Sequence, residues 1–177
     1  MGLSITLIFP SPFPIERIAD LLRQAGAQRA DIRTKLPRGA WSDECVARFS
    51  DESWVLVGRV DYAYCELGSE PGAVLDGQSN AACELIYSLV GRQLEWYIVD
   101  PRSENIENVA NFFRIVCRAQ PRAIVLPNSG EVAYPIDTYA KALDGPDVWN
   151  IIIHGPAAGR IELPDARADA WDGHELQ

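Results

Sequence analysis

Apolar side chains along this chain repeat with two periods, and each period predicts a different kind of element. Runs that are apolar on both faces and end at turn residues predict buried strands. A stripe that repeats every 3.6 residues predicts helices, and Pro14 and Gly26 mark the ends of the first one. The strands predicted in this way are residues 3–9, 94–100 and 122–127, and the helices are residues 15–25 and 103–120.

The middle of the chain alternates apolar and polar residues, which predicts antiparallel strands over residues 44–49 and 54–67. The residues between them, 50–53, have the turn chemistry of a hairpin. At the start of the second strand both faces are apolar, with Trp54 on one face and Val55 on the other. We therefore expect that end of the strand to be buried on both sides.

The order of the elements predicts the fold class. Short connections join a strand, a helix and a strand within residues 94–127, which implies a right-handed crossover between two parallel strands. The remaining segments are a strand at residues 29–36, a short helix at residues 136–146, and residues 81–92, which suit either a helix or a strand. We expect a single α/β (α+β mixed) domain at residues 1–164, with a mixed, mostly antiparallel sheet of about six to eight strands. Two or three helices and one parallel β-α-β crossover complete it, and residues 165–177 form an acidic C-terminal tail.

Residues 148–163 raise the question of whether the chain carries a reactive histidine. Residues 148–153 are rich in β-branched side chains and apolar on both faces, which predicts an interior strand. His154 then opens a connection that ends on Arg160. A phosphate-binding loop would need a lysine and a glycine spacing that opens a helix, and neither is present. We interpret the segment as a structural corner that leads into a short return strand at residues 161–163.

Acidic residues outnumber basic ones by 25 to 16, and the formal net charge is −9. Binding to nucleic acid or to an anionic membrane favours the opposite sign, so we expect neither partner. The surplus is uneven, because eight acids face two arginines between Trp41 and Asn80. This pattern favours an acidic surface that meets a basic protein, although an ordinary soluble protein can carry the same charge. The eight acids are Asp43, Glu44, Asp51, Glu52, Asp61, Glu66, Glu70 and Asp76.

The four cysteines do not have the paired spacing of a zinc site, and the chain has only two histidines. We expect no metal and no cofactor. A thiol nucleophile would pair Cys45 or Cys65 with His154, but no local signature supports either pairing. We expect free thiols in a reducing compartment, with two disulfides as the alternative. Neither a secretory signal nor a membrane-spanning run is recognisable, which predicts a cytoplasmic location.

Five tryptophans are a large number for 177 residues. Trp54, Trp96 and Trp149 lie on predicted strands, so we expect them in the core. Trp41 and Trp171 are flanked by acidic, turn-like residues, as an interface anchor with a polar rim would be. The alternative is that both indoles fold back onto the core. The predicted partner-binding residues are Trp41, Asp43, Glu44, Asp51, Glu52, Trp171 and Asp172.

Three hypotheses of function follow from these observations. The first is a small acidic interaction protein without catalysis that binds and occludes a basic protein partner, most concretely an immunity-type inhibitor of a bacterial toxin. The second is an enzyme acting on a small molecule, with His154 as the base and Arg160 holding an anionic group. The third is a subunit of a homo-oligomer whose interface uses the same aromatic side chains.

Overall fold

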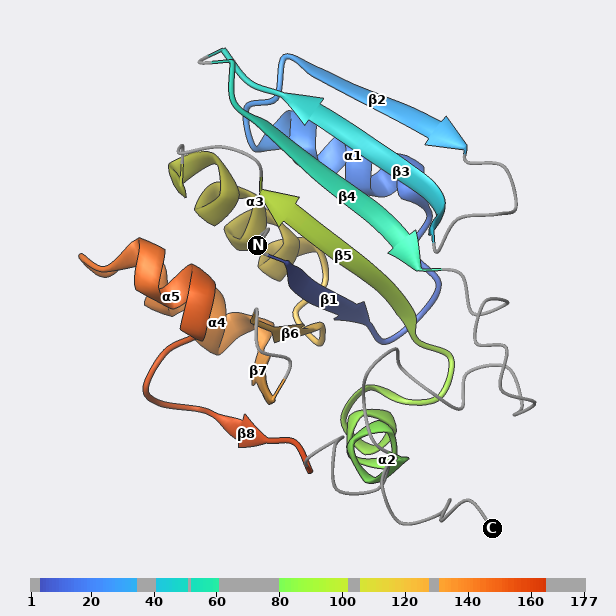
Figure 1. Cartoon of the computed structure of the whole chain (residues 1–177), viewed down its shortest axis with the longest axis vertical. Coiled ribbons are helices and arrows are strands. Elements are labelled where there is room, and N and C mark those ends of the chain that lie inside the picture. The colour runs from blue at the N-terminus through green and yellow to red at the C-terminus, as the bar shows by residue number, and fades with distance from the viewer. Residues whose placement is uncertain are drawn as a thin grey trace, which may run out of the picture.

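β1 (Ile5–Phe9) is an interior strand of an antiparallel sheet (Figure 1). The computed structural model describes residues 4–34, 41–50, 52–60, 80–101, 106–127 and 131–164. The other strands in this part of the chain are β2 (Arg29–Thr34), β3 (Trp41–Arg48), β4 (Trp54–Val60), β5 (Glu95–Pro101), β6 (Ile124–Leu126), β7 (Val132–Pro135) and β8 (Ile161–Glu162). These eight strands follow the order β2-β3-β4-β5-β1-β6-β7-β8, and every neighbouring pair is antiparallel.

β1 separates the two strands that the sequence predicts as a parallel pair. It is hydrogen-bonded to β5 on one side and to β6 on the other, antiparallel to both. β5 and β6 therefore run in the same direction on either side of it, connected through α3 (Ile106–Ala119). Because β5 and β6 are not hydrogen-bonded to each other, the predicted crossover between paired parallel strands and the predicted mixed sheet are wrong. The physical reason is that β1 has buried side chains on both faces, so its most favourable place is between two other strands.

The described residues form five helices, more than the two or three expected. Besides α3 they are α1 (Ile15–Gln24), α2 (Asn80–Val90), α4 (Ile136–Ala142) and α5 (Val148–His154). α2 settles the ambiguous segment as a helix. α5 contradicts the predicted interior strand, because Val148, Ile151 and Ile152 recur at helical spacing and pack on the core. Burial of that stripe outweighs the preference of isoleucine and valine for strands.

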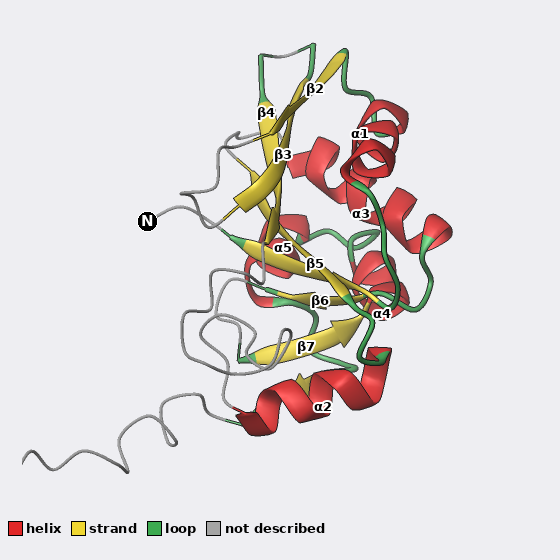
Figure 2. Cartoon of the chain, turned by 90° about the vertical axis from the view of Figure 1, so that its right-hand side faces the viewer, coloured by secondary structure: helices red, strands yellow, loops and turns green. Residues whose placement is uncertain are grey.

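The helices cover the two faces of the sheet unequally (Figures 1 and 2). α1 and α3 lie against one face, where the larger apolar core joins them to strands β1 through β7 and to α4 and α5. α2 lies on the other face, where a smaller core joins it to Trp96 on β5 and to residues of β1, β6 and β7. Among the described elements, no helix crosses that other face at β2, β3 and β4, and we call this area the open face.

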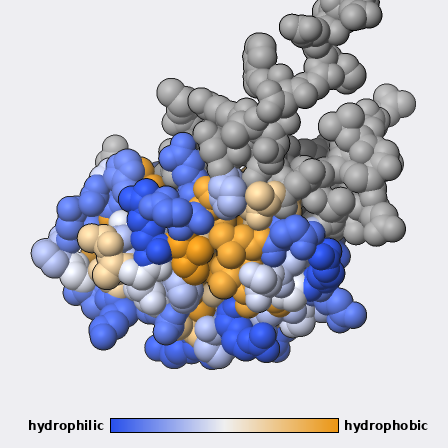
Figure 3. Space-filling model, turned by 90° about the horizontal axis from the view of Figure 1, so that it is seen from below, coloured by the Kyte–Doolittle hydropathy of each residue, from blue (hydrophilic) through white to orange (hydrophobic). Residues whose placement is uncertain are grey.

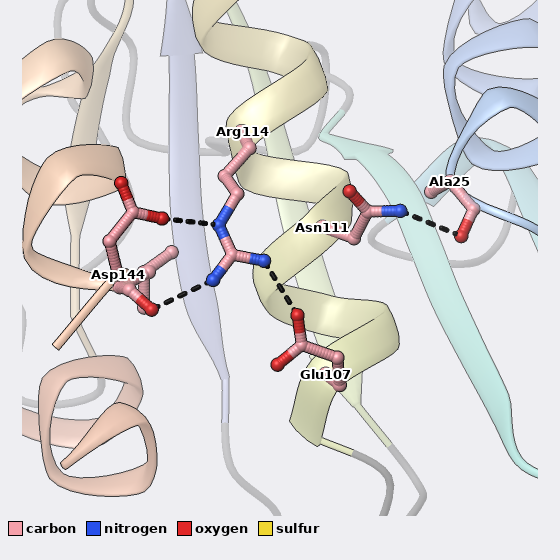
Figure 4. Close-up of polar contacts among 6 residues, drawn as sticks. Ala25, Glu107, Asn111, Arg114 and Asp144 are labelled. Carbon is pink, nitrogen blue, oxygen red and sulfur yellow. Dashed lines mark hydrogen bonds and ion pairs between the residues drawn. The ribbon is translucent and has the colours of Figure 1, made fainter. Parts of the chain in front are cut away.

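Polar contacts on α3 link it to its neighbours within the helical layer (Figure 4). The Arg114 guanidinium donates to the Glu107 carboxylate at 2.7 Å and to the Asp144 carboxylate at 3.0 Å. The Asn111 amide donates to the Ala25 carbonyl, just past the end of α1, at 3.2 Å. These contacts fix α3 to the residue that ends α1 and to the segment that follows α4.

The smaller core reaches the surface on α2 and β8. The view from below shows apolar side chains exposed among hydrophilic ones (Figure 3). Leu89 on α2 is 38% exposed, and Leu85 and Ile161 are only partly buried where they pack against the smaller core. The described part of α2 is therefore apolar on its inner side and partly apolar on its outer side as well.

Both backbone polar groups of Phe13 are hydrogen-bonded to side chains of β5. Its N–H donates to the Glu95 carboxylate, and its carbonyl accepts a hydrogen bond from the Tyr97 hydroxyl. Arg59 on β4 forms an ion pair with the same carboxylate, and the Asp43 carboxylate lies 3.9 Å from Arg59. Burial, with Glu95 nearby, raises the pKa of Tyr97, so its hydroxyl keeps the proton that it donates.

We expect the substitution Tyr97→Phe to lower the free energy of unfolding by about 1–3 kcal/mol, because it leaves the buried Phe13 carbonyl without its donor. The measurement is urea unfolding followed by circular dichroism. Tyr87→Phe is the matched control, since the Tyr87 hydroxyl has no hydrogen-bond partner among the described residues. Equal effects of the two substitutions would contradict the role assigned to Tyr97.

Candidate functional site

The open face carries an open hollow of about 280 Å³. Its lining comes from β2, β3, β4 and the turn between the last two, and consists of Arg33, Val46, Arg48, Glu52, Trp54 and Leu56. Val46 is buried and Leu56 half-buried, so they form an apolar floor. The other four side chains are exposed around it. The hollow therefore combines an apolar base and one indole with charged groups of both signs.

The register of the strands brings these residues together. Arg48 lies directly opposite Trp54, and Val46 lies directly opposite Leu56. Because side chains alternate between the two faces of a strand, all four share the open face. The intervening Val55 points to the α1 side, where it is buried in the larger core.

Trp54 corrects a prediction from the sequence. We expected it in the core, but its side chain is 36% exposed on the open face. Trp149, expected on an interior strand, is 45% exposed on α5. Only Trp96 is buried as predicted, because α2 covers its part of the sheet. The alternation in the sequence predicted that Trp54 and Val55 would lie on opposite faces, but it cannot show which face a helix will cover.

Glu52 stands at a strained position in the hairpin turn. Its φ of 65° lies in the left-handed region, where a residue other than glycine is uncommon. Hydrogen bonds from Glu52 N–H to the Phe49 carbonyl and from Phe49 N–H to the Ser53 carbonyl close the turn. Glycine is the usual residue at such a position in a hairpin loop. The chain instead carries a carboxylate there, at the edge of the hollow.

The structure places the predicted partner-binding residues at different sites. Glu44 lies on the open face with Glu52, although Glu44 is only 6% exposed. Asp43 lies near Arg59 instead, on the side of the sheet that holds the Phe13 contacts. Trp41 is the first residue of β3. The remaining predicted residues, Asp51, Trp171 and Asp172, lie outside the described residues.

His154 and Arg160 lie on either side of a tight turn after α5. His154 is exposed at the last position of the helix, and the Arg160 guanidinium forms an ion pair with Glu162 on β8. Gly155 follows with a φ of 75°, and a Cβ added to it would overlap the Tyr134 ring. This close packing suits the structural corner that we expected. Catalysis by His154 with Arg160 stays a prediction.

The described cysteines are free thiols on separate elements. Cys45 on β3 and Cys83 on α2 are buried, and Cys117 on α3 is half-buried. Cys65 lies outside the described residues. Burial raises the pKa of the Cys45 thiol to about 11, which opposes the thiolate that a nucleophile requires. No group of three His, Cys, Asp or Glu side chains within the described ranges could hold a metal ion.

We expect Glu52→Gly to raise the free energy of unfolding by about 1 kcal/mol, because glycine adopts the left-handed conformation without a steric penalty. Glu52→Ala removes the same carboxylate but keeps the Cβ, so it serves as the control and should not stabilise the protein. Chemical unfolding curves of the three proteins provide the comparison. A gain of stability in the alanine variant as large as in the glycine variant would refute the assignment of strain.

We expect Cys45 to resist a thiol-specific disulfide reagent at pH 8 in the folded protein and to react on unfolding. An ordinary cysteine has a pKa of 9.0, whereas folded Cys45 has a pKa of about 11. Between these values the unfolded chain releases the proton and the folded one keeps it, so Cys45 makes the free energy of unfolding fall as pH rises from 9 to 11. Cys45→Ala should remove that part of the pH dependence. An unchanged slope in the variant would contradict the raised pKa.

The described helices include none that is long and apolar enough to cross a membrane. In the hollow, an exposed aromatic ring, an apolar floor and charged side chains meet. Comparison of the chain with protein-family models, curated proteins and solved structures finds no match.

Proposed function

We propose that this protein binds a basic protein partner through the open face and occludes the surface that it covers. The observation that carries the proposal is the exposed Trp54 above an apolar floor, ringed by Arg33, Arg48 and Glu52. Aromatic and arginine side chains are enriched at the centres of protein interfaces, and a charged rim excludes competing partners. The most concrete form of the proposal is an immunity-type inhibitor of a bacterial toxin.

The open shape of the hollow favours a side chain of another protein over a free small molecule. Pockets for small molecules have volumes of roughly 300–1,000 Å³ and enclose most of the ligand. The hollow here is about 280 Å³, with four of its six lining residues exposed. One anchoring side chain of a partner would fill it, while the rest of the contact spreads over the surrounding strands.

Charge argues for a basic partner. The segment that follows β4, residues 61–79, contains four acids and no basic residue, and it contributes −4 of the net −9. The turn before β4 adds Asp51 and Glu52. Arg33 and Arg48 are compatible with a basic protein, because guanidinium groups donate hydrogen bonds to backbone carbonyls of any partner. Opposite net charges would also speed the encounter of the two proteins.

In the first step of the test, the purified chain captures partners from an extract of the cells that encode it. Each captured protein is then purified for direct binding measurements. We expect one basic protein to bind directly, in a fixed stoichiometry, with an association rate that falls as salt rises. We expect Trp54→Ser to lower its affinity at least about tenfold, because a buried aromatic anchor would be lost. Isothermal titration calorimetry measures both affinities.

Trp149→Ser is the matched control, because Trp149 is even more exposed than Trp54 but lies on α5 rather than on the open face. This variant should bind with nearly unchanged affinity. The proposal fails if no basic protein binds the purified chain directly. It also fails if the Trp54 and Trp149 variants lose affinity to the same extent, since the open face would then have no special part in binding.

A further inference from the structure

We propose that two copies of this chain pair through β2 and join their sheets into one. Among the described strands, β2 is an edge strand of the sheet, with β3 as its one neighbour. All six of its residues pair with β3 in an uninterrupted register. An edge strand of this regularity offers backbone N–H and C=O groups to a further strand. This inference does not depend on the partner proposed for the open face.

The side chains of β2 are self-complementary in one antiparallel arrangement. With Ile32 opposite Ile32 of the second copy, Asp31 of each copy lies opposite Arg33 of the other. Directly opposed residues point to the same face, so this arrangement creates two ion pairs on the open-face side. The same alternation brings the two Ile32 side chains together on the opposite side, next to Cys45 in the register.

Among pairs formed within the described strand, residues 29–34, charge favours this register over its neighbours. A shift that puts Asp31 opposite Asp31 would also put Arg29 opposite Arg33, so every charged pair would be a like-charge pair. A shift in the other direction puts Arg33 opposite Arg33. A shift by a single residue would oppose side chains of different faces. Like charges directly opposite each other destabilise a strand pair, and residues 30–34, which pair among themselves in the Ile32-centred register, form no such pair.

Ile32 adds an apolar contact to the charge pattern. Its side chain is 39% exposed, one of the few large apolar side chains in the described structure with that much exposure. Pairing would cover it with an identical side chain, which removes apolar surface from water. The Arg23 guanidinium already donates to the Ala30 carbonyl on this strand at 3.0 Å. That carbonyl has a second lone pair, so the bond can persist when Ala30 meets Thr34 of the second copy.

The association should be weak. A contact of one strand pair is smaller than the roughly 1,200 Å² that stable interfaces bury in total. Each copy also carries a net charge of −9, although salt screens charges more than about 8 Å apart at physiological ionic strength. We therefore expect a dimer with a dissociation constant on the order of 10–100 µM, visible at high protein concentration.

Sedimentation velocity between about 1 and 500 µM tests the pairing in the absence of any partner, over a range chosen around the expected dissociation constant. We expect Asp31→Arg and Arg33→Asp each to weaken the dimer at least about tenfold, since each variant opposes two like charges. The double variant Asp31→Arg with Arg33→Asp restores opposite charges across the pair and should recover the dimer. Arg118→Asp, an exposed charge reversal on α3, is the control and should dimerise normally.

Cross-linking tests the register. Ile32→Cys places two thiols directly opposite each other, at Cβ atoms about 5 Å apart, whereas Thr34→Cys leaves its two thiols about 13 Å apart along the strands. Under mild oxidation the first variant should form a disulfide-linked dimer much faster than the second, and faster than the protein without either substitution. A monomer at every concentration overturns the proposal. A dimer that is indifferent to the single charge reversals, or equal cross-linking of the two cysteine variants, also overturns it.

Discussion

Two hydrogen bonds between side chains of β5 and the backbone of Phe13 are the interaction on which the arrangement of the sheet and the helical layer depends. The chain must leave the middle of the sheet after β1 and enter the helical layer at α1, and Pro10, Pro12 and Pro14 remove three backbone donors from that passage. The N–H and carbonyl of Phe13 remain, buried, and both need partners. Glu95 and Tyr97 supply them from one strand. Together with the packing of Phe13 and Ile15 in the larger core, these two bonds fix the start of α1 over the sheet.

The same contact explains how a buried carboxylate is tolerated. Glu95 is 6% exposed, and a buried charge without compensation is costly. Its oxygens are used by the Phe13 N–H and by Arg59, which in turn lies near Asp43. Asp43, which is also one of the residues predicted to bind a partner, thus lies next to this group of charges. Of the acids predicted to bind a partner, Glu44 and Glu52 are the two that the described structure places on the open face.

Local patterns in the sequence predicted most elements, because helix stripes and strand alternation depend on neighbouring residues. The stripes of α1 and α3 and the hairpin of β3 and β4 are confirmed within a few residues. Long-range choices could not be predicted. The insertion of β1 between β5 and β6 depends on residues far apart in the chain. A tryptophan on that face of the sheet is buried only where α2 covers it. Trp96 was therefore predicted correctly as a core residue, and Trp54 was not.

The place of β1 in the sheet has a consequence for how the protein is made. β1 is synthesised before the other described strands, yet its two neighbours begin only at residues 95 and 124. β2, β3 and β4 follow one another in the chain, and each pairs with the next, so they can assemble once residue 60 has left the ribosome. β1 then waits without either neighbour while α2, β5 and α3 emerge. The nascent chain therefore carries an unpaired apolar segment, β1, that chaperones can bind until Leu126 has left the ribosome and the middle of the sheet can close.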